Sequence, residues 1–139
     1  MSANHSHTEA ALARHLQAFA ISSVDGVMQD YTEKSVLVIP DGPLHGLGEI
    51  RRFFTGFIET LPAGFLQEFK IRKLEIVGEL GYLVWEASPW VLLGTDTFLV
   101  RNGHIMMQTF AAHPLSWLPN KWSNGKTSSG RKDIAARPE

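Results

Sequence analysis

The sequence contains no cysteine, so disulfide bonds, thiol catalysis and thiolate metal sites are all excluded. It also lacks an apolar run of membrane-spanning length and the basic-then-apolar pattern of a signal peptide. An excess of positive charge is also missing, since the formal net charge is −1. The composition therefore gives no sign of a basic surface that would bind nucleic acid. We therefore expect a cytoplasmic protein that binds neither membrane nor nucleic acid.

Motifs for metals and cofactors are also missing. The pair His5 and His7 is too short and too near the chain end to define a metal site by itself. We therefore expect no metal and no cofactor. The 139 residues are 44% hydrophobic, which is ordinary for one globular domain. The expected division is a polar leader at 1–7, a domain at 8–113 and a basic C-terminal tail at 114–139.

Three helices are expected in the first half of the chain. Thr8 can cap a first helix at Glu9–Ala20, and a second, short helix follows at Val24–Tyr31. The third, at about Leu47–Leu61, has the clearest helical periodicity. Its apolar face consists of Ile50, Phe53, Phe54, Phe57, Ile58 and Leu61.

Strands dominate the second half. A short β-branched strand precedes the third helix and is followed by a loop at Asp41–Gly46, and the remaining strands follow that helix. The apolar parity switches within 65–78, which predicts a β-bulge near Arg72 and Lys73. Asn102-Gly103 is typical of a tight hairpin turn. The expected strands are Ser35–Ile39, Phe65–Gly78, Tyr82–Ser88, Trp90–Arg101 and His104–Ala112.

Helices segregated from a run of strands indicate an α+β fold. A bulged, bent sheet curls, and three helices packed on one side close it into a cone. Such a cone has one mouth and a largely apolar floor, which favours a small-molecule pocket.

Asp96 is the strongest candidate for function. Strand alternation places it on the same face as Phe98 and Val100, a face that otherwise belongs to the core. A carboxylate among apolar side chains is unfavourable unless it is hydrogen-bonded, paired or protonated. The alternative is that Gly94 shifts the register and turns Asp96 outward.

Three stretches give the chain a resemblance to the nuclear-transport-factor-2-like (NTF2-like) superfamily, in its ketosteroid-isomerase and SnoaL-like branches. This resemblance implies a cystatin-like α+β cone, with a curved and mainly antiparallel sheet. It covers most of the chain between Thr8 and Ala112. The stretches are Val24 to Tyr31 through Pro40, the glycine-opened segment Gly46–Phe54, and Asp96–Phe98 followed by Asn102-Gly103.

The resemblance implies only half of the ketosteroid isomerase chemistry. Those enzymes use a carboxylate base before the proline that ends the first strand, with a tyrosine and a protonated aspartic acid as oxyanion donors. Asp96 takes the place of the donor acid and His15 that of the donor tyrosine, but Ile39 takes the place of the base and cannot move a proton. Ketosteroid isomerase activity is therefore not expected. His15 could equally be a core histidine bonded to a backbone carbonyl or to Asp96.

Other side chains are weaker candidates. Asp41 and His45 lie near the expected mouth, where either could supply a base, although Asp-Gly-Pro is also ordinary turn chemistry. Both faces of the last strands carry apolar residues, which predicts a homodimer packed through the sheet. The expected pocket residues are Phe19, Tyr31, Ile39, Phe54, Phe57, Trp85, Trp90 and Phe98.

Three hypotheses for function follow. The first is a pocket for an apolar, oxygen-bearing small molecule, with cofactor-independent isomerase, cyclase or hydratase chemistry in which Asp96 and His15 are catalytic. The second is a non-catalytic ligand-binding or accessory module, which Ile39 at the base position favours. The third is a dimerising scaffold with a vestigial pocket.

Overall fold

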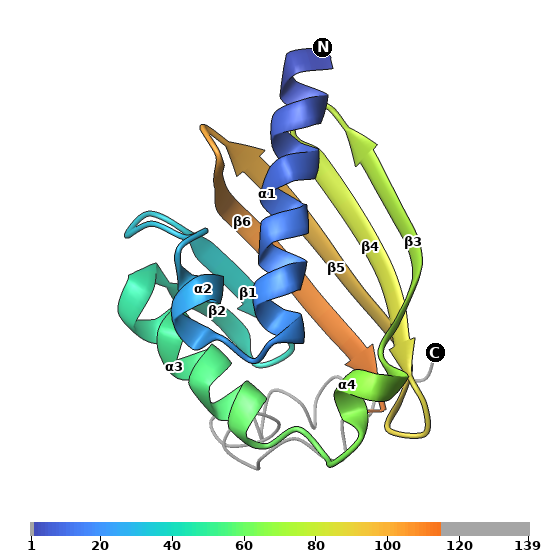
Figure 1. Ribbon diagram of the computed structural model, residues 1–139. Coiled ribbons are helices and arrows are strands. Elements are labelled where there is room, and N and C mark those ends of the chain that lie inside the picture. Colours follow the sequence, from blue (N-terminus) through green and yellow to red (C-terminus); the bar gives the residue numbers. More distant parts are fainter. Residues whose placement is uncertain (1, 115–139) are drawn as a thin grey trace, which may run out of the picture.

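Three helices cover one face of a curved sheet in the computed structural model, which describes residues 2–114 and, for residues 2 and 3, the backbone only (Figure 1). They are α1 (Ser2–Ala20), α2 (Val24–Met28) and α3 (Gly46–Glu59), and a four-residue helix α4 (Phe65–Glu68) follows. The α+β cone expected from the sequence is confirmed. The predicted tail lies outside the described residues from 115 onward.

The first helix begins earlier than expected. It starts at Ser2, so the polar segment at 2–7 continues the helix. Thr8 is therefore no cap: its Oγ1 donates a hydrogen bond to the carbonyl of Gly78, 2.7 Å away. This bond ties α1 to the turn between two strands of the sheet.

Six strands form one sheet in the order β2-β1-β6-β5-β4-β3. Strands β3 to β6 form an antiparallel meander, and β1 joins the edge of β6 in parallel. The sheet is therefore mainly antiparallel, as predicted. The bounds are β1 Val36–Ile39, β2 Gly42–His45, β3 Lys70–Val77, β4 Leu80–Ala87, β5 Val91–Arg101 and β6 His104–His113.

Two expected elements are wrong. The segment predicted as a loop after Ile39 contains β2, because Gly42 adopts φ 127° and lets the chain turn back at once onto β1. The residues predicted as the start of a long strand instead form α4, which places Phe65 in the core against Trp85 and Trp90.

The predicted bulge is present, since the pairing of β3 with β4 shifts between Ile71 and Lys73. A second irregularity lies between β4 and β5, beside Gly94. A Cβ added to Gly94 would lie 2.2 Å from Cε2 of Trp85, so the indole ring packs directly on this backbone. The glycine thus allows the indole to lie flat on the inner face of the sheet.

The two faces of the sheet differ. Asp96, Phe98 and Val100 are all buried on the inner face beneath the helices, as their parity predicted.

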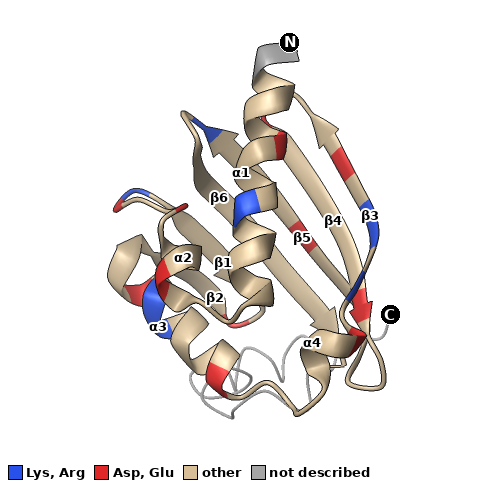
Figure 2. Ribbon diagram, viewed as in Figure 1, with Lys and Arg blue, Asp and Glu red and all other residues tan. Residues whose placement is uncertain are grey.

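Figure 2 shows charged residues on β3 and α3, whereas β1 and β6 carry no Lys, Arg, Asp or Glu. Within residues 2–114, no helix is long and apolar enough to cross a membrane.

Candidate functional site

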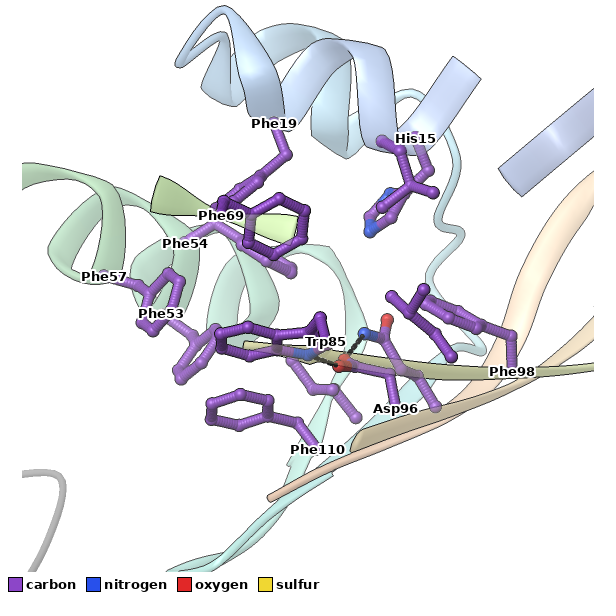
Figure 3. Close-up of a pocket in the computed structure, with 14 residues that line it drawn as sticks. His15, Phe19, Phe53, Phe54, Phe57, Phe69, Trp85, Asp96, Phe98 and Phe110 are labelled. Carbon is purple, nitrogen blue, oxygen red and sulfur yellow. Dashed lines mark hydrogen bonds between the residues drawn. The ribbon is translucent and has the colours of Figure 1, made fainter. Parts of the chain in front are cut away.

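A cavity lies between α1, α3 and the inner face of the sheet (Figure 3). The volume open to the centre of a water-sized sphere is about 50 Å³, which exceeds the need of a single water molecule. Four lining side chains carry polar atoms: His15, Trp85, Asp96 and Gln108. The remaining lining residues are Leu16, Phe19, Leu37, Phe53, Phe54, Phe57, Phe69, Leu83, Phe98 and Phe110.

Asp96 is held from two sides by N–H donors. The indole Nε1 of Trp85 donates to Oδ1 at 2.8 Å, and Nε2 of Gln108 donates to Oδ2 at 2.9 Å. All three residues come from neighbouring strands, since Asp96 faces Leu83 on β4 and Phe110 on β6. Because a carboxylate can accept about four hydrogen bonds, lone pairs remain for a ligand.

Burial raises the pKa of Asp96 from 3.8 to about 6. The hydrogen bonds from Trp85 and Gln108, and the charge of His15, act in the opposite direction and lower it. A pKa near 6 suits a general base, because the group is ionised at neutral pH and still takes up a proton readily. Asp96 therefore differs from the donor acid that the family resemblance implied: both of its oxygens accept N–H bonds.

His15 occupies the opposite wall of the cavity, on α1 (Figure 3). Its Nδ1 lies 3.3 Å from Oδ2 of Asp30, a carboxyl that is only 2% exposed. Three aromatic rings pack edge-on around the imidazole, those of Tyr31, Phe54 and Phe98. The aspartate thus fixes the ring, which points into the cavity and leaves Nε2 for a ligand.

A second chain of hydrogen bonds runs behind Asp96. The hydroxyl of Tyr31 donates to Oε1 of Gln108, whose Nε2 in turn donates to Asp96. Burial, together with the charges of Asp96 and Asp30, raises the pKa of Tyr31 well above its usual value, so the phenol stays neutral. Tyr31 is itself 4% exposed.

The structure brings several of the predicted pocket residues to the cavity wall, and places others elsewhere. Tyr31, Ile39 and Trp90 do not line it: Tyr31 lies behind Gln108, Ile39 is in the core, and Trp90 packs on Phe65. The predicted pocket residues on the wall are Phe19, Phe54, Phe57, Trp85 and Phe98.

The two alternative bases do not line the cavity either. Asp41 is buried in the turn between β1 and β2, where it is 7% exposed. His45 is exposed at the end of β2, and its backbone N–H donates to Glu49. Neither is in position to act on a molecule in the cavity. For His15, the alternative of a bond to a backbone carbonyl or to Asp96 is replaced by a bond to Asp30.

Sequence reasoning missed Gln108 and Asp30. Gln108 could have been found, because it shares the inner parity of Phe110 and pairs with Phe98 across the hairpin. Asp30 had no such signal, since it lies in an irregular segment after α2. Within the described residues, no group of three or more His, Asp and Glu side chains could hold a metal ion.

Compared by sequence, the chain matches no protein-family model and no curated protein. Solved structures do resemble it. An NTF2-like protein of unknown function from Burkholderia xenovorans superposes with a TM-score of 0.62 at 20% identity, over 77% of this chain and 83% of that one. A SnoaL-like protein of unknown function from Burkholderia thailandensis gives 0.62 at 8% identity, over 77% and 94%.

A candidate ketosteroid isomerase from Kribbella flavida superposes with a TM-score of 0.60 at 13% identity, over 78% of this chain and 79% of that one. The fold is therefore that of the NTF2-like proteins, and the predicted resemblance is confirmed at the level of fold. This fold is compatible with a small-molecule pocket at the position of the cavity.

Proposed function

We propose that this chain is an enzyme that moves a proton on a small molecule by general acid–base catalysis, in a reaction of the isomerase, cyclase or hydratase type. One observation carries the proposal: His15 and Asp96 lie on opposite walls of one apolar cavity, each held by a buried partner. Paired titratable groups in a water-poor cavity are typical of acid–base sites.

In this proposal Asp96 is the base. It removes a proton from a carbon beside a carbonyl group, and the electrons of the broken C–H bond move to the carbonyl oxygen. His15, with Nδ1–H bonded to Asp30, uses Nε2–H of its imidazolium form to stabilise that oxygen. Asp96 then returns its proton to the same or a conjugated carbon, which completes an isomerisation without another reactant. In D₂O the proton on Asp96 exchanges with the solvent before this return, so the carbon receives deuterium.

The cavity also limits the substrate. Ten of the fourteen lining side chains carry no polar atom, and a negatively charged ligand would be repelled by Asp96 and Asp30. The volume of about 50 Å³ is below the roughly 300–1,000 Å³ of pockets for drug-sized molecules. We therefore expect a compact, uncharged molecule with one or two oxygen atoms. A larger ligand must displace an aromatic ring.

Exchange of carbon-bound hydrogen tests this function. Butanone and cyclopentanone in D₂O should lose their α-hydrogen signals faster with the protein than without it. Because general acid–base groups contribute about 10²–10⁴-fold, Asp96→Asn should reduce the catalysed rate at least about 100-fold. Asp25→Asn is the matched control, since Asp25 is an exposed acid paired with Arg51 outside the cavity. Equal rates in wild type and Asp96→Asn would refute the proposal.

A non-catalytic binding module is the second candidate, favoured by Ile39 at the place of the family's base. It predicts that a ligand raises the melting temperature of the wild type and raises it less in Asp96→Asn, while no hydrogen exchange is catalysed. A scaffold with a vestigial pocket would show neither effect.

We also propose a homodimer packed through the outer face of the sheet. In-register pairing aligns an apolar row across five strands, formed by Val77, Leu80, Leu99, Met107 and Val36. Val77 is 66% exposed and Met107 48% exposed, although both belong to this one row. A contiguous apolar face of this kind is typical of a protein–protein contact.

A further inference from the structure

The side chain of Gln108 can lie in either of two orientations between Tyr31 and Asp96. A carboxamide has an N–H₂ end and a carbonyl end, and each end faces one of these two partners. When Nε2 faces Asp96, the acid must accept, so the ionised form is favoured. When Oε1 faces Asp96, the acid must donate, so the protonated form is favoured. The orientation of one amide thus decides the role of the acid.

Tyr31 distinguishes between these two orientations. Its neutral hydroxyl carries one hydrogen, and the hydrogen bond that it donates goes to Oε1 of Gln108. In the flipped orientation Nε2 would point at the hydroxyl, and the hydroxyl hydrogen would lose this acceptor. A buried O–H without an acceptor is unfavourable by about 1–3 kcal/mol. The phenol therefore favours the orientation in which Nε2 faces Asp96.

We infer that Tyr31 is a positioning residue that acts through Gln108: it holds the amide with Nε2 toward Asp96 and so keeps Asp96 a hydrogen-bond acceptor and base. Tyr31 does not line the cavity, so it does this without touching a ligand. The inference deepens the proposed function and rests on it for its catalytic meaning, but the protonation state of Asp96 can be measured without any substrate.

Other groups around Asp96 have separate effects. Trp85 on β4 donates to the other carboxylate oxygen, and its N–H cannot reverse. His15 on α1 lowers the pKa of Asp96 through its charge. The lining residues from α3 are phenylalanines and carry no titratable group. Asp30 lies beyond His15 and Tyr31. Of the two side chains that hydrogen-bond to Asp96, Gln108 is therefore the one whose donor and acceptor ends can exchange.

The test is a titration of the Asp96 carboxyl carbon by NMR in the full chain labelled with ¹³C-aspartate. Tyr31→Phe removes the hydroxyl and keeps the ring, so the Asp96 midpoint should rise above its wild-type value by about one pH unit. Gln108→Leu should raise it too. In the Gln108→Leu background, Tyr31→Phe should add nothing, because the amide through which it acts is gone.

Phe53→Leu is the control for simple loosening of the core, because Phe53 is buried at the same cavity but makes no hydrogen bond to Asp96. It should lower stability and leave the Asp96 midpoint in place. An Asp96 midpoint unchanged by Tyr31→Phe, or raised equally with and without Gln108, would overturn the inference.

The wild-type chain offers a measurement that does not depend on a variant folding. The side-chain N–H₂ signals of Gln108 should shift with the same midpoint as Asp96, because Nε2 donates to the carboxylate and this hydrogen bond weakens as the acid gains its proton. Amide signals that do not change through that pH range would overturn the inference. Absence of hydrogen exchange in ketones would refute the proposed enzyme and leave these titrations unaffected.

Discussion

The inner and outer faces of the sheet are built from the same strands and differ in chemistry. Along β5, Asp96, Phe98 and Val100 are buried inside, whereas Thr97 and Leu99 between them are half-buried outside. On β5 the inner face thus has a carboxylate beside apolar side chains beneath the helices, and the outer face has threonines and Leu99. The period of two lets one strand line a cavity on one face and carry exposed apolar side chains on the other.

The comparison also shows how the inner face changes the chemistry of an acid. An acid on the outer face would be hydrated and have an ordinary pKa. On the inner face it loses water, and the N–H groups of Trp85 and Gln108, together with the charge of His15, compensate in part. The helices that cover the inner face therefore raise the pKa of Asp96 as well as form the core.

The largest expected effect comes from pH acting on the inner face. Asp96 binds its proton more tightly in the folded chain, since its pKa is about 6 there and 3.8 is its ordinary value. Its contribution to the free energy of unfolding is therefore fully present below pH 3.8 and is lost as the pH rises through about 6. Conversion of this shift gives about 3 kcal/mol. Asp96→Asn should lack this decline in urea unfolding, and identical pH dependence in both proteins would contradict the account.

The next effect concerns the close packing of the inner face. Gly94→Ala places a Cβ 2.2 Å from Trp85, so the indole must move and the hydrogen bond to Asp96 is disturbed. We expect a loss of about 2 kcal/mol in unfolding free energy. Gly48→Ala in α3 is the control, because its Cβ would meet nothing within 4 Å. It should be neutral or stabilise by up to about 1 kcal/mol. Equal effects of the two substitutions would show that the indole does not pack on Gly94.

A smaller effect is expected where α1 is anchored over the inner face. Thr8→Ala removes the hydrogen bond to the carbonyl of Gly78 and should lower the free energy of unfolding by about 1 kcal/mol. Thr8→Ser keeps the hydroxyl and should recover most of this loss. If the serine variant is as unstable as the alanine variant, the lost methyl packing is responsible and the hydrogen bond is not.

The outer face should tolerate change with the smallest effect on folding. Met107→Lys should alter the unfolding free energy of the monomer by no more than about 0.5 kcal/mol, because the side chain is 48% exposed. In light scattering, however, it should convert the proposed dimer into a monomer. Gln67→Lys, exposed on α4, should leave the mass unchanged. If the wild-type chain is already monomeric, the proposed dimer contact through the outer face is refuted.

The sequence was sufficient for those parts of the fold that follow from local pattern. The periodicity around Phe53 and Phe57 predicted α3, the parity switch predicted the bulge beside Lys73, and Asn102-Gly103 predicted the hairpin. It failed for β2 and α4, where a glycine conformation and the burial of Phe65 outweighed the local pattern.

The candidate site was less predictable than the fold. Asp96 could be identified because it interrupts an apolar face. The hydrogen-bond partners of the site could not be identified in this way. Strand pairing brings Gln108 to Asp96 from 12 residues away in the sequence. The path of the chain after α2 brings Asp30 to His15 from 15 residues away. Strand alternation says which face a residue takes, and tertiary packing decides which side chain meets it there.

The central claim is that His15 and Asp96 influence one another across one cavity, and a carboxyl titration tests it directly. In ¹³C-labelled wild type, Asp96 should titrate at about pH 6, and in His15→Phe its midpoint should rise, because the imidazole charge lowers the pKa of Asp96. Phenylalanine preserves the edge-on ring packing at this position. A wild-type midpoint near pH 3.8, or one that does not move in His15→Phe, would contradict the claim.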